Sequence, residues 1–185
     1  MTSQSNPFKK VGSREIYENP WIKVTEDQII KPNGESGIYG KLNFKNYALG
    51  IVALSDNQDI RLVGQYRYVL DAYSWEIPTG GGSLEVPPLE GAQRELREET
   101  GLSADHWEEL IRIHLSNAIT DELGIIYLAK NLTAGQTEFD DTEVLEIKQI
   151  PFKNALHMVL NSKITDSMSV TGILATAQKL GIIDL

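Results

Sequence analysis

A chain of 185 residues is long enough for one α/β domain with a full-sized core and a small appended element. Its net charge of −9 and pI of about 4.8 argue against a general nucleic-acid binder, because phosphate backbones select for surplus Lys and Arg. The absence of cysteine from the sequence excludes disulfides, thiolate catalysis and Cys-based zinc sites.

The N-terminal residues are polar, and we expect residues 1–12 to be loosely ordered. They lack the apolar core of a signal peptide, and no run approaches the roughly 18 apolar residues of a membrane span. We therefore expect a cytoplasmic protein with no membrane partner.

β-prone runs over 16–24 and 28–44 surround a Pro-Asn-Gly turn. They predict a small antiparallel element over residues 1–45, ahead of a main domain over residues 46–185. Next come two apolar runs, 47–54 and 60–68, whose turn-rich connection predicts a β-hairpin.

A Gly-rich turn at 80–82 precedes a helix that should begin near Pro87 and Pro88, since proline is tolerated in a first turn. Gly101 is placed to end that helix as a C-cap residue. Further strands are expected over 111–115, 124–129 and 144–150, and helices over 152–160 and 167–180. The last helix carries an apolar stripe at Val170, Ile173, Leu174 and Ala177. This order of elements indicates an α/β fold, with a mixed sheet between helices.

Three glutamates, Glu95, Glu98 and Glu99, fall on one face of the helix that ends at Gly101. Two carboxylates about 6 Å apart repel by about 3 kcal/mol at an effective dielectric of about 20, so this face favours cations. Mg²⁺ and Mn²⁺ are the hard, oxygen-preferring ions that fit. The alternative is a solvated charged helix in which Arg94 pairs with Glu98.

The stretch from Gly80 to Leu102 resembles the Nudix box, G-x5-E-x7-R-E-U-x-E-E-x-G-U, where U is aliphatic. One position departs from the pattern, because Val86 stands where the box has Glu. In the family that Glu mainly supports the box Arg, and we hypothesise that Glu90 replaces it by pairing with Arg94. The matching residues are Gly80, Arg94, Glu95, Leu96, Glu98, Glu99, Gly101 and Leu102.

Segments outside the box resemble the ADP-ribose and nucleoside-diphosphate-sugar branch of the Nudix family. They are Gln65-Tyr66-Arg67, Trp75-Glu76-Ile77-Pro78 and the opening run Asn19-Pro20-Trp21-Ile22-Lys23-Val24. The resemblance implies an α/β/α sandwich with a mixed sheet, and N-terminal strands that exchange contacts in a homodimer.

The same resemblance implies hydrolysis of a diphosphate bond in ADP-ribose or a related nucleoside-diphosphate sugar, giving NMP and a sugar phosphate. Glu95 and Glu99 would be direct metal ligands, and Glu98 a direct or water-bridged ligand that also counts as catalytic. The carbonyl of Thr79 would supply a further ligand oxygen.

A general base usually comes from an acidic segment after the box in this branch. Glu143, in the run 138–143, is our first choice and Glu122 the second; either is also plausible as an exposed loop acid. We expect Arg67 to bind the diphosphate, because a guanidinium forks onto phosphate oxygens. Glu76 would lie near the nucleoside or ribose.

The base and sugar of the substrate stay open. Family ADP-ribose hydrolases commonly carry a Pro about sixteen residues after the box, where this chain has Asn117. A different class of function is a ligand sensor or interaction domain that has lost turnover, which the Val86 departure favours. Hydrolysis of RNA caps or nucleoside triphosphates fits poorly with the acidic charge.

Overall fold

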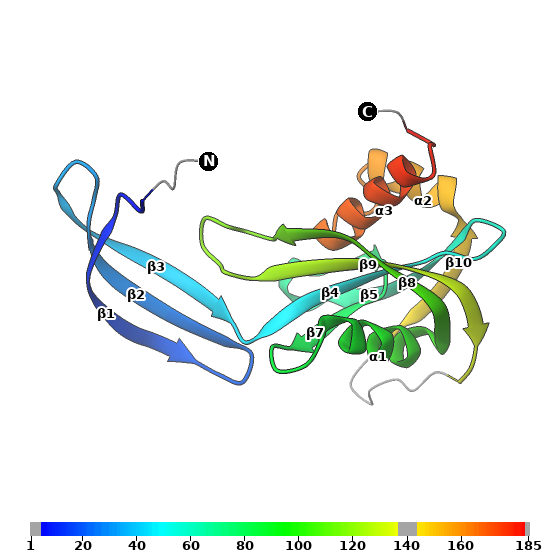
Figure 1. Ribbon diagram of the computed structural model, residues 1–185, viewed down its shortest axis with the longest axis horizontal. Helices are drawn as coiled ribbons and strands as arrows, with labels where there is room; N and C mark the ends of the chain where they lie inside the picture. Colours follow the sequence, from blue (N-terminus) through cyan, green and yellow to red (C-terminus); the bar gives the residue numbers. More distant parts are fainter. Residues whose placement is uncertain (1–4, 137–143, 184–185) are drawn as a thin grey trace. The chain divides into compact units, whose positions relative to one another are not determined.

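The computed structural model describes residues 5–136 and 144–183, which form ten strands, three α-helices and one short 3-10 helix (Figure 1). The strands are β1 (Lys9–Glu18), β2 (Ile22–Ile30), β3 (Ser36–Phe44), β4 (Asn46–Ala53), β5 (Asp59–Arg67), β6 (Ala72–Glu76), β7 (Thr79–Ser83), β8 (Leu102–His114), β9 (Leu123–Ala134) and β10 (Glu146–Pro151). The helices are η1 (Tyr68–Leu70), α1 (Pro88–Thr100), α2 (Phe152–Leu160) and α3 (Ser167–Lys179). None of the described helices is long and apolar enough to cross a membrane.

The chain divides into two compact units. The N-terminal unit comprises residues 1–46 and 116–122, and the main unit comprises residues 47–115 and 123–185. Residues 116–122 join the N-terminal unit through backbone and side-chain bonds to β3. The Leu42 N–H donates to the Ile119 carbonyl at 2.9 Å, and the Asn43 amide donates to Asp121 at 2.6 Å. The connection between β8 and β9 is therefore part of the N-terminal unit.

The N-terminal unit is built on an antiparallel sheet in the order β1-β2-β3. Two predictions were wrong here: β1 begins at Lys9, inside the region expected to be loose, and the run 16–24 is two strands rather than one. The side chain of Asn19 explains the break, because its oxygen accepts the N–H groups of Trp21 and Ile22 at 2.9 and 2.8 Å. An Asx turn of this kind reverses the chain locally.

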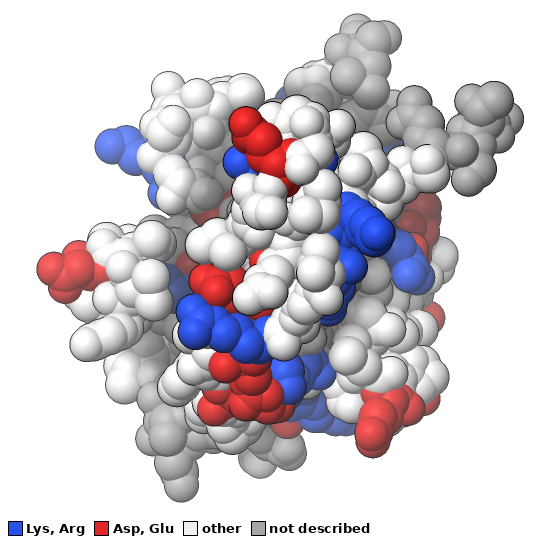
Figure 2. Space-filling model, turned by 90° about the vertical axis from the view of Figure 1, so that its left-hand side faces the viewer, with Lys and Arg blue, Asp and Glu red and all other residues white. Residues whose placement is uncertain are grey.

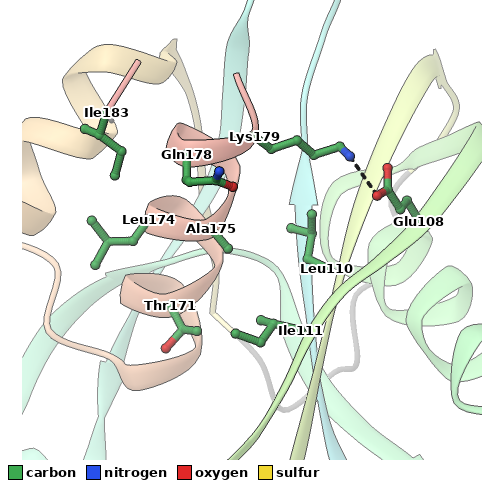
Figure 3. A pocket seen from close by; sticks show the side chains of 9 residues that line it. All are labelled: Glu108, Leu110, Ile111, Thr171, Leu174, Ala175, Gln178, Lys179 and Ile183. Atoms are coloured by element: carbon green, nitrogen blue, oxygen red, sulfur yellow. Dashed lines mark hydrogen bonds and ion pairs between the residues drawn. The ribbon is translucent and has the colours of Figure 1, made fainter. Parts of the chain in front are cut away.

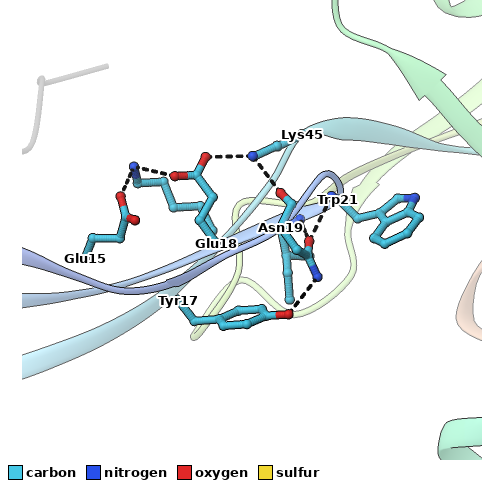
Figure 4. A network of polar contacts seen from close by, with 8 residues as sticks. Glu15, Tyr17, Glu18, Asn19, Trp21 and Lys45 are labelled. Carbon is cyan, nitrogen blue, oxygen red and sulfur yellow. Dashed lines mark hydrogen bonds and ion pairs between the residues drawn. The ribbon is translucent and has the colours of Figure 1, made fainter.

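A polar network fixes this turn against the end of β3 (Figure 4). The Lys45 ammonium lies 2.6 Å from a Glu18 oxygen and donates to the Asn19 carbonyl at 2.7 Å. Lys23 contacts the other Glu18 oxygen at 3.2 Å. These two lysines lower the pKa of Glu18, with the Lys45 hydrogen bond as the larger cause.

Lys and Arg side chains lie beside Asp and Glu side chains, without an unbroken basic patch, on the face in Figure 2. Within the N-terminal unit, Arg14 lies 3.0 Å from Glu26 and Lys10 lies 3.3 Å from Asp27. Many of the basic side chains of this unit are therefore paired with carboxylates.

Asp27 is the buried acid of the N-terminal sheet. The pKa of its carboxyl falls from 3.8 to about 2, mainly because Lys41 and then Ser13 donate hydrogen bonds to it. A carboxyl with a depressed folded pKa stabilises the fold above its unfolded pKa, and that contribution is lost as the pH falls through the folded pKa.

We therefore expect Asp27→Asn to lower the Tm at pH 7, and the difference from wild type to shrink as the pH falls from about 4 to about 2. Thermal unfolding followed by circular dichroism across that range measures the effect. A Tm difference that stays constant from pH 7 to pH 2 would contradict the assigned role of the charge.

Two sheets form the main unit. The mixed sheet runs β7-β4-β9-β8, with β4 and β9 parallel and β8 and β9 antiparallel, and the second sheet runs β10-β5-β6. The prediction that 47–54 and 60–68 form a hairpin was wrong except at the tip. There, a single bridge joins Leu54 and Ile60. Strand β4 pairs with β7 and β9, whereas β5 pairs with β6 and β10, so the two strands enter different sheets.

Helices cover both faces of the mixed sheet (Figure 1). Leu49, Ile51 and Ala53 of β4 pack with Ala92 and Leu96 of α1. The alternate residue Val52 packs in the cluster that contains α2 and α3. Successive strand side chains point to opposite faces, which produces the predicted α/β/α sandwich.

Local signals set the limits of the helices. Pro88 opens α1, and Gly101 ends it in the left-handed region at φ 68°, as predicted. Asp166 caps α3, in which Ile173 and Ala177 of the predicted stripe are fully buried.

Candidate active site

The acidic face of α1 lies at the edge of the core. Leu96 is fully buried and fixes the rotation of the helix about its axis. The side chain of Glu98 is 34% exposed and that of Glu95 is 12% exposed, whereas Glu99 as a residue is 3% exposed. Three carboxylates thus line one face of α1, from its buried edge outward.

Strand β7 runs against this face of α1. The Thr79 N–H donates to Glu99 Oε2 at 3.0 Å. At Gly80 an added Cβ would lie 2.0 Å from Glu95 Cδ, so only glycine leaves room for the carboxylate. The predicted turn at 80–82 is therefore a strand, in which the missing side chains permit a close approach to the helix.

Arg94 bonds to the two outer carboxylates. Its guanidinium donates to Glu95 at 2.5 Å, to Glu98 at 2.8 Å and to the Gly81 carbonyl at 3.0 Å. The hypothesis that Glu90 pairs with Arg94 was wrong: within the described part of the chain, the Glu90 carboxylate has no ion-pair partner. Val86 is 42% exposed in the turn before α1.

We expect Glu90→Gln to leave Mn²⁺ affinity and turnover within about twofold of wild type, because exposed charges away from a site contribute little. Isothermal calorimetry and steady-state kinetics measure both quantities. A loss of tenfold or more in either would restore Glu90 as the support of Arg94.

Arg67 and Glu76 were predicted to bind substrate, and the structure pairs them with each other. Arg67 Nε donates to Glu76 Oε1 at 3.0 Å, and Arg67 Nη2 donates to Glu76 Oε2. Nη2 also donates to Thr79 Oγ1 at 3.4 Å. The Glu76 carboxylate raises the pKa of Arg67, against a smaller opposing effect of burial. With the side chain of Glu76 3% exposed and that of Arg67 39% exposed, Glu76 orients a guanidinium that solvent can reach.

Arg67, Glu76, Thr79 and Glu99 therefore form one connected set of polar contacts in the main unit, and Arg94, Glu95 and Glu98 form a second set on the same helix face. The candidate bases are Glu122 and Glu143. Glu122 belongs to the N-terminal unit, where burial, and secondly Asp121, raise its pKa. Glu143 lies outside the described residues, so both assignments remain predictions.

The donor set of α1 suits a hard divalent cation, since it consists of carboxylates beside backbone oxygens. Gly80 has no side chain, which leaves space for the Glu95 carboxylate, and the Thr79 N–H donates a hydrogen bond to Glu99. No three Asp, Glu or His side chains converge into a complete cation site in residues 5–136 and 144–183, where Arg94 contacts both Glu95 and Glu98. The residue types and their support fit a cation, and Arg94 competes for two of the three carboxylates.

A cavity of about 490 Å³ lies between α3 and β8 (Figure 3). Its walls include the apolar side chains of Leu110, Ile111 and Leu174, with a Lys179–Glu108 ion pair of 2.8 Å at one side. It shares no residue with the box, so this cavity is separate from the candidate active site.

The sequence analysis missed two polar residues connected to the site. Asp166 and Ser169 at the start of α3 form a hydrogen-bonded pair, and Ser169 accepts the Ile77 N–H at 2.9 Å. An Asp directly before an apolar-periodic run is a recognisable N-cap signal. That signal predicts the helix start, and it does not predict the bond to Ile77.

Comparison with known families agrees with this fold. Residues 45–167 match the NUDIX domain, and residues 8–42 match the nucleoside diphosphate sugar hydrolase N-terminal domain. The chain belongs to the Nudix family, as an enzyme of its pyrophosphohydrolase class.

Individual relatives point the same way. The chain is 33% identical over 174 residues to an ADP-ribose pyrophosphatase of Mycobacterium tuberculosis, covering 91% of this chain and 82% of the relative. It is 31% identical over 184 residues to a GDP-mannose pyrophosphatase of Yersinia enterocolitica, covering 91% and 94%. A crystal structure of an ADP compounds hydrolase superposes with a TM-score of 0.86, covering 97% of each chain at 18% identity, which supports the fold alone.

Proposed function

We propose that this enzyme hydrolyses the diphosphate bond of ADP-ribose or a related nucleoside-diphosphate sugar, releasing NMP and a sugar phosphate. The observation that carries the proposal is the carboxylate face of α1, held against β7 by the Thr79–Glu99 bond and the bare Gly80. The named relatives act on ADP-ribose and GDP-mannose, which supports a nucleoside-diphosphate sugar as the substrate class.

Glu95, Glu98 and Glu99, with the Thr79 carbonyl, would hold a divalent cation, Mg²⁺ or Mn²⁺. When bound, such an ion neutralises charge on the phosphates and lowers the pKa of a water. Arg67 would bind a phosphate oxygen, and Glu76 would fix the plane of its guanidinium. Glu143, or in its place Glu122, would accept the proton of the attacking water.

The test is a panel of substrates incubated with the purified chain and Mg²⁺ or Mn²⁺: ADP-ribose, ADP-glucose, GDP-mannose, FAD, NADH and dNTPs. We expect cleavage of a nucleoside-diphosphate sugar, seen as NMP and sugar phosphate by anion-exchange chromatography. Preferred cleavage of dNTPs would contradict the proposed substrate class. Binding of ADP-ribose by calorimetry without cleavage of any compound would favour the ligand sensor, the alternative that rests on Val86.

We further propose a cytoplasmic homodimer that uses the N-terminal unit as a contact. Val11, Ile16 and Ile38 of its sheet are 61%, 51% and 67% exposed, which is a large apolar exposure for a small sheet. Sedimentation equilibrium should give the mass of two chains. A monomer mass at every protein concentration up to about 100 times a micromolar dimer Kd would contradict the homodimer.

A further inference from the structure

The first turn of α3 carries a polar relay that ends on the backbone of another element. Asp166 Oδ2 accepts from the Ser169 N–H at 2.8 Å and from the Ser169 hydroxyl at 2.7 Å. Ser169 is fully buried, and its Oγ accepts the Ile77 N–H at 2.9 Å. Because the Ser169 hydroxyl donates its hydrogen bond to Asp166, a lone pair of Oγ is left to accept the Ile77 N–H.

Ile77 lies where the chain leaves one sheet of the main unit and enters the other. It follows Glu76, whose carboxylate holds Arg67, and it precedes Thr79, whose N–H holds Glu99. Between them, the Pro78 carbonyl accepts the Ile51 N–H at 2.9 Å. Four consecutive residues, 76–79, are thus fixed to β5, α3, β4 and α1 in turn.

We propose that Asp166 and Ser169 are positioning residues, which hold residues 76–79 so that Arg67 and Glu99 keep their working orientations. The proposal rests on the proposed function and assigns part of its site to a helix outside the box. Neither residue contacts the box glutamates in the described bonds; both act through the backbone at Ile77.

Asp166 has a second connection to this site. Its charge adds to those of Glu76 and Glu99 in stabilising the cationic form of Arg67, with Glu76 the largest contributor. A purely structural helix cap would need neither the bond to Ile77 nor this proximity to Arg67.

The test compares Ser169→Ala with Thr176→Val in the full chain. Thr176 also lies in α3 and is fully buried, but its hydroxyl has no hydrogen-bond partner among the described residues. Thr176→Val is therefore a matched loss of one buried hydroxyl. We expect Ser169→Ala to lower kcat on ADP-ribose by about 10- to 100-fold, as outer residues of a site do, with KM within about threefold. Thr176→Val should leave both constants within about twofold.

Asp166→Ala and Asp166→Asn give a second comparison. Asparagine retains an oxygen that can accept both Ser169 bonds, so Asp166→Asn should recover most of the kcat that Asp166→Ala loses. A merely structural role predicts that Ser169→Ala lowers the Tm while kcat and KM stay within about twofold of wild type, and that result would overturn the proposal.

Amide hydrogen exchange separates this proposal from the proposed function. In Ser169→Ala, exchange should accelerate at Ile77 and Thr79 more than in the rest of the main unit, whether or not any diphosphate is cleaved. Wild type that cleaves nothing would end the proposed function and leave this readout intact. Unchanged exchange at Ile77 and Thr79 would overturn the positioning role even in an active enzyme.

Discussion

Replacing Glu99 by Gln should lower kcat by at least about a hundredfold while the fold stays intact, because a bound cation contributes several kcal/mol of charge stabilisation to the transition state. Glu99 is 3% exposed and accepts the Thr79 N–H, and a Gln oxygen can accept the same bond. The substitution therefore removes a charge and preserves the shape. Relief of repulsion among the three carboxylates should keep the Tm equal to or above that of wild type.

Steady-state kinetics with ADP-ribose, and Mn²⁺ affinity by calorimetry, measure the effect. Glu90→Gln is the matched control, since it removes the same charge from the exposed side of the same helix. Turnover by Glu99→Gln close to that of wild type would refute the assignment of Glu99 as a ligand, and equal losses in both variants would point to net charge instead.

The limits of the helices were predictable because their signals are local. Pro88 and Gly101 bracket α1, and Pro151 precedes α2, so backbone constraints within a few residues decide where each helix begins or ends. The acidic face of α1 followed from residue spacing, which the helical repeat converts directly into a surface.

Strand pairing was less predictable, since its determinants lie far apart in the sequence. The apolar runs of β4 and β5 were predicted as strands, but β4 pairs with β7 and β9, and β5 with β6 and β10, rather than with each other. Strand β8 extends from Leu102 to His114, well beyond the predicted 111–115. The prediction was too short because most residues of this strand are exposed or half-buried and many are polar. A short apolar run therefore marks only part of such a strand.

The polar contacts within the site show the same division between local and long-range determinants. The spacing of the box predicted which glutamates share a face and offered the Arg94–Glu98 pair as an alternative, but it did not predict the contact between Arg94 and Glu95. The sequence placed Glu76 near the nucleoside, which stays a prediction, and it did not reveal that the buried carboxylate binds Arg67. The Ser169–Ile77 bond spans 92 residues, and no local pattern could reveal it. Side-chain partners depend on packing, which the sequence specifies only through the whole fold.

Gly80→Ala should weaken Mn²⁺ binding and lower kcat by about 10- to 100-fold each, with a small change in Tm. The added Cβ would lie 2.0 Å from Glu95 Cδ and 2.2 Å from Glu95 Oε2. These atoms are the far end of a flexible side chain, so the carboxylate can swing away while the backbone stays in place. The substitution thus displaces a proposed ligand without removing it, which separates the position of the carboxylate from its presence.

Gly40→Ala provides the control, because nothing lies within 4 Å of the Cβ that it adds to another strand. Thermal unfolding and Mn²⁺ calorimetry on both variants distinguish a local effect from a general cost of alanine in a strand. If Gly80→Ala binds Mn²⁺ and turns over as wild type does, the close approach of β7 to α1 does not orient Glu95. If its Tm falls steeply instead, the backbone rather than the side chain absorbs the clash, and Gly80 serves packing of β7 on α1.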